Sequence, residues 1–338
     1  MSTTNTSVFD WIEERFDPQI CTSEEFIYDE MESQSGFSLP IIYQPFDSRE
    51  KWHWADRGSA YDFLYSTQGE GKRLLDFGPG DGWPSLLVAP YVKEVVGLDA
   101  SKRRVEVCSQ NAERLGIENA RFVSYDPGTN LPFDDNSFDG VMAASAVEQT
   151  PNPKEILEEF YRVLKPGGRL RISYEALNRY KGGKERDIWI AGLGEEVTKI
   201  ILYNRKIEEE YVIQYGLTAA ISKEEIEGQL LDKDGQVDFD QLLPYLEKIE
   251  SKITNVQSTK TVHPSGRTYI DWLEDIGFSK VKSTHNGNAA AWKLYEQYSD
   301  QDRPDNLEAV NQAVKKVVKV AIELEAPVEL DKRITAVK

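Results

Sequence analysis

Residues 74–82 read Leu-Leu-Asp-Phe-Gly-Pro-Gly-Asp-Gly. An apolar run reaches the acid Asp76, and glycines follow at every second position, at Gly78, Gly80 and Gly82. Glycine adopts positive φ without steric cost and has no Cβ, so the main chain here can turn sharply and approach a ligand closely. The pattern predicts a strand, a glycine loop and a helix, which is the layout of a nucleotide-binding βα turn.

Further apolar segments follow this loop, and helix-compatible segments separate them. The predicted strands span 94–99, 121–126, 138–144 and 169–174. Ser101 is placed to cap one of the intervening helices, and Gly116 to end it. Strands that alternate with helices predict an α/β fold with a doubly wound, mostly parallel sheet and helices on both faces.

Composition restricts the partners that we expect. The chain has 40 lysines and arginines against 58 aspartates and glutamates, which gives a formal net charge of −18. Such a surface repels nucleic acid and anionic lipid, so neither is an expected partner. No window approaches the roughly 20 apolar residues of a membrane span, and the first ten residues lack a signal pattern. Cys21 and Cys108 form no CxxC pair, so we expect no cysteine metal site and a cytoplasmic protein.

The segment 74–174 resembles the core of class I S-adenosylmethionine-dependent methyltransferases, particularly the branch that includes quinone and small-molecule methylating enzymes. A lone glycine loop would be weak evidence, because dinucleotide-binding enzymes share it. Four signatures occur here in the family's order: Leu-Asp-Phe-Gly-Pro-Gly-Asp-Gly at 75–82, Gly-Leu-Asp-Ala-Ser at 97–101, Leu-Pro-Phe-Asp-Asp-Asn-Ser-Phe-Asp at 131–139 and Arg-Val-Leu-Lys-Pro-Gly-Gly-Arg-Leu at 162–170. The resemblance implies a Rossmann-like fold and S-adenosyl-L-methionine as cofactor, with S-adenosyl-L-homocysteine as product.

Asp99 lies 23 positions after Asp76, close to the spacing at which a carboxylate accepts hydrogen bonds from both ribose hydroxyls of an adenosine ligand. The family's adenine-binding acid corresponds to Asp126, although a turn residue before Pro-Gly is the alternative interpretation. The loop amides and Asp76 suit the carboxylate and ammonium of the methionine moiety. The predicted cofactor-binding residues are Asp76, Gly78, Pro79, Gly80, Gly82, Asp99, Ala100, Asp126, Pro127 and Ala144.

Two residues are candidate catalytic groups. Glu148 matches an acid that the family carries after the fourth strand, at the carboxyl ends of the strands where open parallel sheets bind ligands. Its alternative role is that of a structural acceptor for backbone amides. Gln149 stands where histidine is common in the family, which removes the easiest general base. His263 is the histidine that we would test first.

The remaining segments complete the predicted organisation. Residues 1–70 form a helical extension whose aromatic-rich part either packs on the sheet or covers a ligand. The core comprises 71–175 and 265–298, ending in an antiparallel hairpin of 279–284 and 289–295 around Asn-Gly. Residues 176–264 are an inserted α+β cap expected on the acceptor side, and 304–325 a helix that docks on the body or joins a second subunit as a homodimer.

The sequence therefore predicts an enzyme that transfers a methyl group from S-adenosylmethionine to a small-molecule acceptor, without a metal. Two alternatives stay open. One is a regulatory or partner subunit that binds the cofactor without turnover, which the absence of histidine at 149 favours. The other is a methyltransferase of protein side chains, for which the long insertion would be a docking surface.

Overall fold

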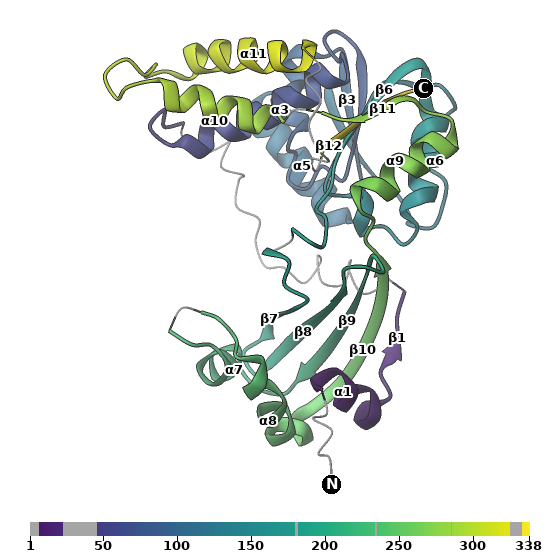
Figure 1. Ribbon diagram of the computed structural model, residues 1–338, viewed down its shortest axis with the longest axis vertical. Helices are drawn as coiled ribbons and strands as arrows, with labels where there is room; N and C mark the ends of the chain where they lie inside the picture. Colours follow the sequence, from purple (N-terminus) through teal and green to yellow (C-terminus); the bar gives the residue numbers. More distant parts are fainter. Residues whose placement is uncertain (1–6, 23–45, 180–181, 234, 285, 325–332) are drawn as a thin grey trace. The chain divides into compact units, whose positions relative to one another are not determined.

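The computed structural model describes residues 7–22, 46–179, 182–233, 235–284, 286–324 and 333–338 (Figure 1). The chain divides into two compact units. Unit 1 draws on residues 1–34 and 177–263, and unit 2 on residues 35–176 and 264–338.

Unit 2 is built on a seven-stranded sheet with the order β11-β12-β6-β5-β2-β3-β4. From β2 the chain adds β3 and β4 on one side and then β5 and β6 on the other, all parallel. The order therefore reverses between β2 and β5, which is where open parallel sheets bind ligands. The strand bounds are β2 Arg73–Phe77, β3 Glu94–Asp99, β4 Ala120–Ser124, β5 Phe138–Ala144, β6 Leu164–Ser173, β11 Ser279–Ser283 and β12 Arg333–Val337.

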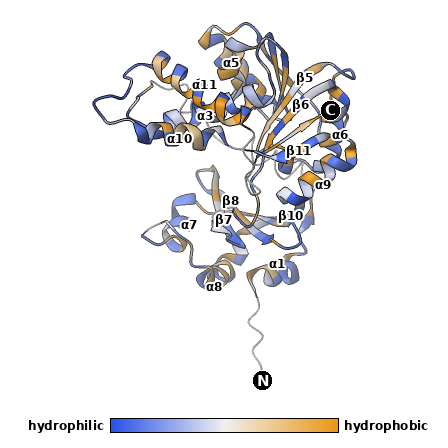
Figure 2. Cartoon of the chain, turned by 45° about the horizontal axis from the view of Figure 1, so that its top comes forward, coloured by the Kyte–Doolittle hydropathy of each residue, from blue (hydrophilic) through white to orange (hydrophobic). Residues whose placement is uncertain are grey.

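Helices cover both faces of this sheet, because successive residues of each strand point to opposite sides. Leu75, Val96 and Val141 share one buried cluster with α6 and α9, whereas Leu74 shares another with α3, α10 and α11. Figure 2 shows the hydrophobic residues concentrated in the central strands and in α3. The helix bounds are α3 Lys51–Ser66, α4 Ser85–Val88, α5 Lys102–Leu115, α6 Pro153–Val163, α9 Gly266–Ile276, α10 Gly287–Gln297 and α11 Leu307–Glu323. The doubly wound, mostly parallel fold predicted from the sequence is confirmed.

The predicted terminal hairpin is wrong in its second strand. Residues 289–295 lie in α10, and Asn286 caps that helix by accepting a hydrogen bond from the Asn288 amide. The segment is rich in alanine, the strongest helix former, so its helix propensity outweighs the Asn-Gly turn signal. The antiparallel edge forms elsewhere, since β12 lies between β6 and β11 and is antiparallel to both.

Unit 1 contains a five-stranded sheet with the order β1-β10-β9-β8-β7. Strand β1 is parallel to β10, and the other pairs are antiparallel. Helices α1, α7 and α8 pack against one face through a shared apolar cluster. The bounds are β1 Gln19–Ile20, β7 Arg186–Gly194, β8 Val197–Lys206, β9 Tyr211–Ala219, β10 Ile253–Val262, α1 Val8–Phe16, α7 Lys223–Leu230 and α8 Phe239–Ile249.

The N-terminal extension predicted over residues 1–70 is not one body. Helix α1 contributes Val8, Phe9 and Ile12 to the core of unit 1, whereas α3 belongs to unit 2. Part of the predicted aromatic stretch, including Tyr43, lies outside the described residues. Trp54 and Tyr61 on α3 are buried, so these two aromatic residues pack in the core, as the first of the two interpretations predicted. No helix in the described part of the chain is long and apolar enough to cross a membrane.

Helix α11 docks on its own unit. Val310, Val314 and Val318 are fully buried in the cluster that also contains residues of α3 and α10. The helix therefore packs on unit 2 through these three valines. Val320 and Leu324 near the end of the helix are exposed.

Candidate cofactor-binding site

The glycine loop after β2 has the conformation that its sequence predicts. The φ angles of Gly78, Gly80 and Gly82 are +70°, +57° and +108°, in the region that favours glycine. A Cβ at position 78 would lie 2.4 Å from the Cβ of Ala146, so the loop runs against the segment that follows β5. A Cβ at position 80 would meet only the Arg104 guanidinium, at 3.6 Å. The loop is therefore closely packed at Gly78 and open at Gly80.

Helix α5 holds this loop through three side chains. Cys108 Sγ donates to the carbonyl of Gly80 at 3.0 Å, and Asn111 Nδ2 donates to the carbonyl of Asp81 at 2.7 Å. Arg104 Nη1 lies 2.8 Å from Asp81 Oδ1 in an ion pair that is largely buried. The sequence alone did not reveal these bonds. The spacing of 104, 108 and 111, which puts the residues on one helix face, was the available signal.

Two amide groups of the loop have no acceptor among the residues that the structure describes. Gly78 N donates to Leu98 O at 2.9 Å, and Gly82 N donates to Pro79 O at 2.8 Å. The N–H groups of Gly80 and Asp81 make no hydrogen bond to any described residue, although both residues are half-buried. Adjacent free amides in a turn form a concave site that binds anions. The loop thus presents an anion-binding pair of donors at its open position.

Asp76 lies beneath the loop as a buried carboxyl group. Its Oδ2 accepts from Ser85 Oγ at 2.5 Å and from Ser85 N at 3.2 Å. Its Oδ1 has no partner within the described ranges. Burial raises the pKa of Asp76 to about 7, the hydrogen bonds from Ser85 oppose this shift, and the charge of Asp99 adds to it. A buried carboxyl with one free oxygen is suited to a cationic donor.

Asp99 is the last residue of β3, and only 5% of its surface is exposed. Its Oδ1 accepts from Ser101 N at 3.0 Å, while Ser101 Oγ caps α5. Ala100 and Ala144, at the carboxyl ends of β3 and β5, are half-buried. Asp99 therefore lies at the same edge of the sheet as the glycine loop, as the sequence predicted for a ribose-binding acid.

Asp126 is placed differently from the other predicted site residues. Strand β4 ends at Ser124, and the Asp126 side chain is exposed. The carbonyl of Asp126 accepts from Thr129 N at 3.2 Å and from Thr129 Oγ1 at 2.6 Å, which closes a turn. The backbone of Asp126 thus forms the turn that was its alternative interpretation. The roles of Asp126 and Pro127 in binding adenine stay predictions.

The segment after β5 makes a strained turn. Ser145 has φ of +52°, which is uncommon for a residue with a side chain. Ser145 N donates to Ser173 O at 2.9 Å, and Gln149 Nε2 donates to Ser145 O at 2.7 Å. Backbone strain of this kind concentrates at functional sites. The turn brings Ala146 against Gly78, so the loops after β2 and β5 meet at the switch point.

Glu148 follows this turn and is buried. Its Oε1 accepts from Glu175 N at 3.1 Å, which links the segments that follow β5 and β6. Burial raises the pKa of Glu148 to about 7, and the hydrogen bonds to the carboxylate oppose the shift. The buried hydroxyl of Tyr269 on α9 interacts with this carboxyl group and opposes the rise of its pKa, although the hydroxyl and Glu148 Oε2 fall outside strict hydrogen-bond geometry. Glu148 accepts a backbone amide, which was its alternative role, and a catalytic role stays a prediction.

His263 lies outside this unit. It follows β10 in unit 1, and its amide donates to Glu210 O at 2.8 Å. The predicted cofactor residues and Glu148 all belong to unit 2, whereas His263 does not. A role for His263 in catalysis therefore stays a prediction.

Comparison with known proteins agrees with this geometry. Residues 75–172 match the family of methyltransferase domains. The uncharacterized methyltransferase YcgJ of Bacillus subtilis (strain 168) is 41% identical over 100 residues, which cover 30% of this chain and 39% of that protein. The 24-methylenesterol C-methyltransferase 2 of Arabidopsis thaliana is 34% identical over 118 residues, covering 35% and 32% of the two chains. The 27-O-demethylrifamycin SV methyltransferase of Amycolatopsis mediterranei (strain S699) is 32% identical over 118 residues, covering 35% and 43%.

Residues 75–172 are thus a methyltransferase domain, and the sheet order makes it a Rossmann-like domain of class I. A methyltransferase domain over these residues agrees with the resemblance to class I S-adenosylmethionine-dependent methyltransferases that the sequence motifs indicate. The chain spans less than half the length of each of the three relatives.

Proposed function

We propose that this protein transfers a methyl group from S-adenosyl-L-methionine to a small-molecule acceptor. The observation that carries the proposal is the glycine loop, with its free amides at Gly80 and Asp81, between the buried acids Asp76 and Asp99. Sequence similarity to methyltransferases of a sterol and of a rifamycin, over 35% of this chain in each case, supports the reaction class.

The residues of unit 2 fit the three polar parts of this cofactor. The free amides of Gly80 and Asp81 would accept the carboxylate, and Oδ1 of Asp76 would accept the ammonium. The Asp99 carboxylate offers two acceptor oxygens to two ribose hydroxyls. Pro79, Ala100, Pro127, Ala144 and Asp126 would complete the walls around the adenosine.

Bound S-adenosylmethionine supplies an electrophilic methyl group on a sulfonium sulfur. The chain's own contribution is to hold the cofactor's polar ends and to orient the acceptor for in-line attack, since positioning alone supplies much of the rate of such a displacement. Glu148 and His263 are the candidate proton acceptors for an acceptor atom that must lose a proton. The inserted residues 176–264 would supply acceptor-recognising side chains.

We also propose a cytoplasmic location and a homodimer. The negative net charge favours a cytoplasmic enzyme of small molecules over one that acts on nucleic acid. A homodimer would use the exposed residues of α11, Val320 and Leu324. Light scattering on Val320→Glu tests this interface, because the charge would shift a dimer to monomer and leave a monomer unchanged.

Calorimetric titration with S-adenosylmethionine tests the site. We expect saturable binding that weakens at least tenfold in Asp99→Ala, because two ribose hydroxyls lose their acceptor. Asp134→Ala, which removes an exposed acid of unit 2, is the matched control and should bind normally. Absence of binding, or unchanged affinity of Asp99→Ala, would refute the assignment.

Turnover separates the three candidate functions. Protein incubated with methyl-labelled cofactor and a metabolite extract should place label in the small-molecule fraction. Label in the macromolecular fraction would favour the side-chain methyltransferase instead. Tight cofactor binding without transfer to either fraction would favour the regulatory subunit.

A further inference from the structure

Unit 1 contains a cavity of about 700 Å³ that lies apart from the proposed cofactor site. Its lining comes from Lys184 and residues 186–190 at the start of β7, from Lys223 and Glu227 on α7, and from Leu231, residues 235–237 and Phe239 near the start of α8. None of these residues belongs to the proposed cofactor site. The volume lies within the range of small-molecule pockets.

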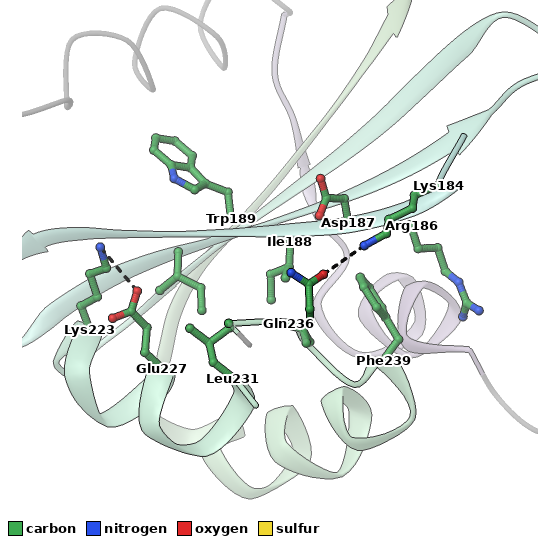
Figure 3. Close-up of a pocket in the computed structure, with 13 residues that line it drawn as sticks. Lys184, Arg186, Asp187, Ile188, Trp189, Lys223, Glu227, Leu231, Gln236 and Phe239 are labelled. Carbon is green, nitrogen blue, oxygen red and sulfur yellow. Dashed lines mark hydrogen bonds and ion pairs between the residues drawn. The ribbon is translucent and has the colours of Figure 1, made fainter. Parts of the chain in front are cut away.

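The topology of unit 1 explains why this space is left open. Strand β7 is the last strand in the sheet order, with β8 on one side of it. After α7 the chain makes a short excursion, closed by a bridge between Leu231 and Val237, before α8 begins at Phe239. Figure 3 shows this excursion below β7, with Ile188 and Gln236 between the strand and the helices.

One side of β7 changes from charged to apolar along its length. Side chains two residues apart in a strand point to the same face, so Arg186, Ile188 and Ile190 share one. Leu231 and Phe239 line the opposite wall. In Figure 3, Lys184 and Arg186 lie at one end of the cavity and the Lys223–Glu227 pair at the other. The cavity thus has a cationic end and an apolar middle.

The two acids of the lining are already neutralised. Glu227 lies 3.5 Å from Lys223, and Asp187 lies 3.5 Å from Arg205. At the cationic end, Lys184 Nζ donates to Gln236 Oε1 at 3.1 Å, and the Arg186 guanidinium lies 5.6 Å from the Phe239 ring centre. Within the described part of the chain, neither Lys184 nor Arg186 pairs with a carboxylate. Two such adjacent cations stand out in a chain of net charge −18.

We propose that this cavity binds a small amphipathic carboxylate, with its anionic group at Lys184 and Arg186 and its apolar body along Ile188, Ile190 and Leu231. The two cations complement one anion, and Arg186 can bind a carboxylate through two parallel hydrogen bonds. The apolar middle of the cavity gains free energy by covering the hydrocarbon body. This carboxylate site is separate from the proposed cofactor site, and its test does not require methyl transfer.

Calorimetry of the full chain with decanoate and decanol tests the charge requirement, because the two probes share one hydrocarbon chain. We expect decanoate to bind at least tenfold more tightly than decanol, and hexanoate to bind more weakly than decanoate. Equal affinities of decanoate and decanol would overturn the proposal.

Variants locate the site. The double variant Lys184→Gln and Arg186→Gln should weaken decanoate binding at least tenfold and leave decanol unchanged. Lys248→Gln removes an exposed cation from α8 of the same unit and should behave as the native chain. Unchanged decanoate affinity in the double variant, or an equal loss in Lys248→Gln, would overturn the assignment. Thermal unfolding of each variant verifies the fold without any reference to cofactor binding.

Discussion

Ser85 Oγ donates a 2.5 Å hydrogen bond to Oδ2 of Asp76, and both side chains are buried. This bond favours the charged form of a carboxyl group whose pKa burial raises to about 7. Because a cationic ligand group binds the charged carboxylate, we expect the affinity for S-adenosylmethionine to rise as pH rises from 6 to 8. In Ser85→Ala the pKa of Asp76 should increase further and move this rise to higher pH.

Calorimetric dissociation constants at several pH values between 6 and 8 measure this effect. Ser109→Ala removes an exposed hydroxyl from α5 and is the control. An affinity that stays flat over this range in the native chain would show that Asp76 does not meet the ligand's charge.

Gly80 tests whether the ligand contacts the glycine loop, because Gly116 has nearly the same backbone conformation and is a matched control. Gly80 has φ of +57° and Gly116 has φ of +66°. Alanine at either position should cost about 1 kcal/mol of folding free energy through backbone strain. Only Gly80→Ala places a methyl group at the open position of the loop, so it alone should weaken cofactor binding, by at least tenfold.

Urea unfolding and calorimetry on both variants separate strain from ligand contact. Equal binding losses in Gly80→Ala and Gly116→Ala would mean that strain alone acts. Retained affinity in Gly80→Ala would mean that the ligand does not approach the loop there.

The sheet of unit 2 could be predicted because its signals are local. A buried strand, a glycine loop and a capped helix each have a sequence pattern that spans only a few residues, as at Asp76, Gly78 and Ser101. The loop's anchors could not be found in this way. Cys108 has the sequence appearance of an ordinary core residue, and its bond to Gly80 O depends on how α5 packs against the loop.

Strand β12 shows the same limit for the fold. Its residues pair with β6, where Arg333 stands opposite Ser173. A five-residue segment at this sequence distance carries no local sign of that pairing. Its one unusual feature, a buried Arg333, is explained only by a carboxylate from α3, Asp62. Residues 289–295 likewise form a helix because of their helix propensity and their packing on α3, although the preceding Asn-Gly pair predicts a turn between strands.

Asp62 is the centre of that buried network. Its Oδ2 accepts from Arg171 Nη2 at 2.8 Å, from Arg333 Nη1 at 3.0 Å and from the amide of Gly287 at 2.8 Å. The two guanidinium groups lower the pKa of Asp62 against the effect of burial. Asp62→Asn keeps the shape but leaves two buried cations without this charge, so we expect a loss of about 3–5 kcal/mol in unfolding free energy.

Urea unfolding at neutral pH measures this loss, and Asp134→Asn on the surface is the control. Because the pKa of Asp62 is lowered, its stabilisation is present above the ordinary value of 3.8 and is lost as pH falls below it. The difference between Asp62→Asn and the native chain should therefore shrink in acid. A loss below 1 kcal/mol at neutral pH would contradict the network's structural role.

Glu148 should show the opposite dependence on pH, because burial raises its pKa from 4.5 to about 7. The folded state then binds more protons than the unfolded state between these values, so Glu148 makes the chain less stable as pH rises through this window. Glu148→Gln keeps an oxygen for the Glu175 amide and removes the charge. We expect it to match the native chain near pH 4 and to exceed its unfolding free energy at pH 8 by up to about 3 kcal/mol.

The measurement is urea unfolding at pH 4, 6 and 8, with Glu158→Gln on the exposed side of α6 as the control. A variant less stable than the native chain at pH 8 would show that the Glu148 charge is paired and stabilising.

The variant Glu148→Gln also separates the two candidate roles of this residue. If Glu148 takes the acceptor's proton, Glu148→Gln should be more stable yet lose at least a hundredfold in turnover while binding the cofactor normally. If Glu148 only joins the segments after β5 and β6, the variant should keep the turnover of the native chain, because the hydrogen bond from Glu175 N is retained.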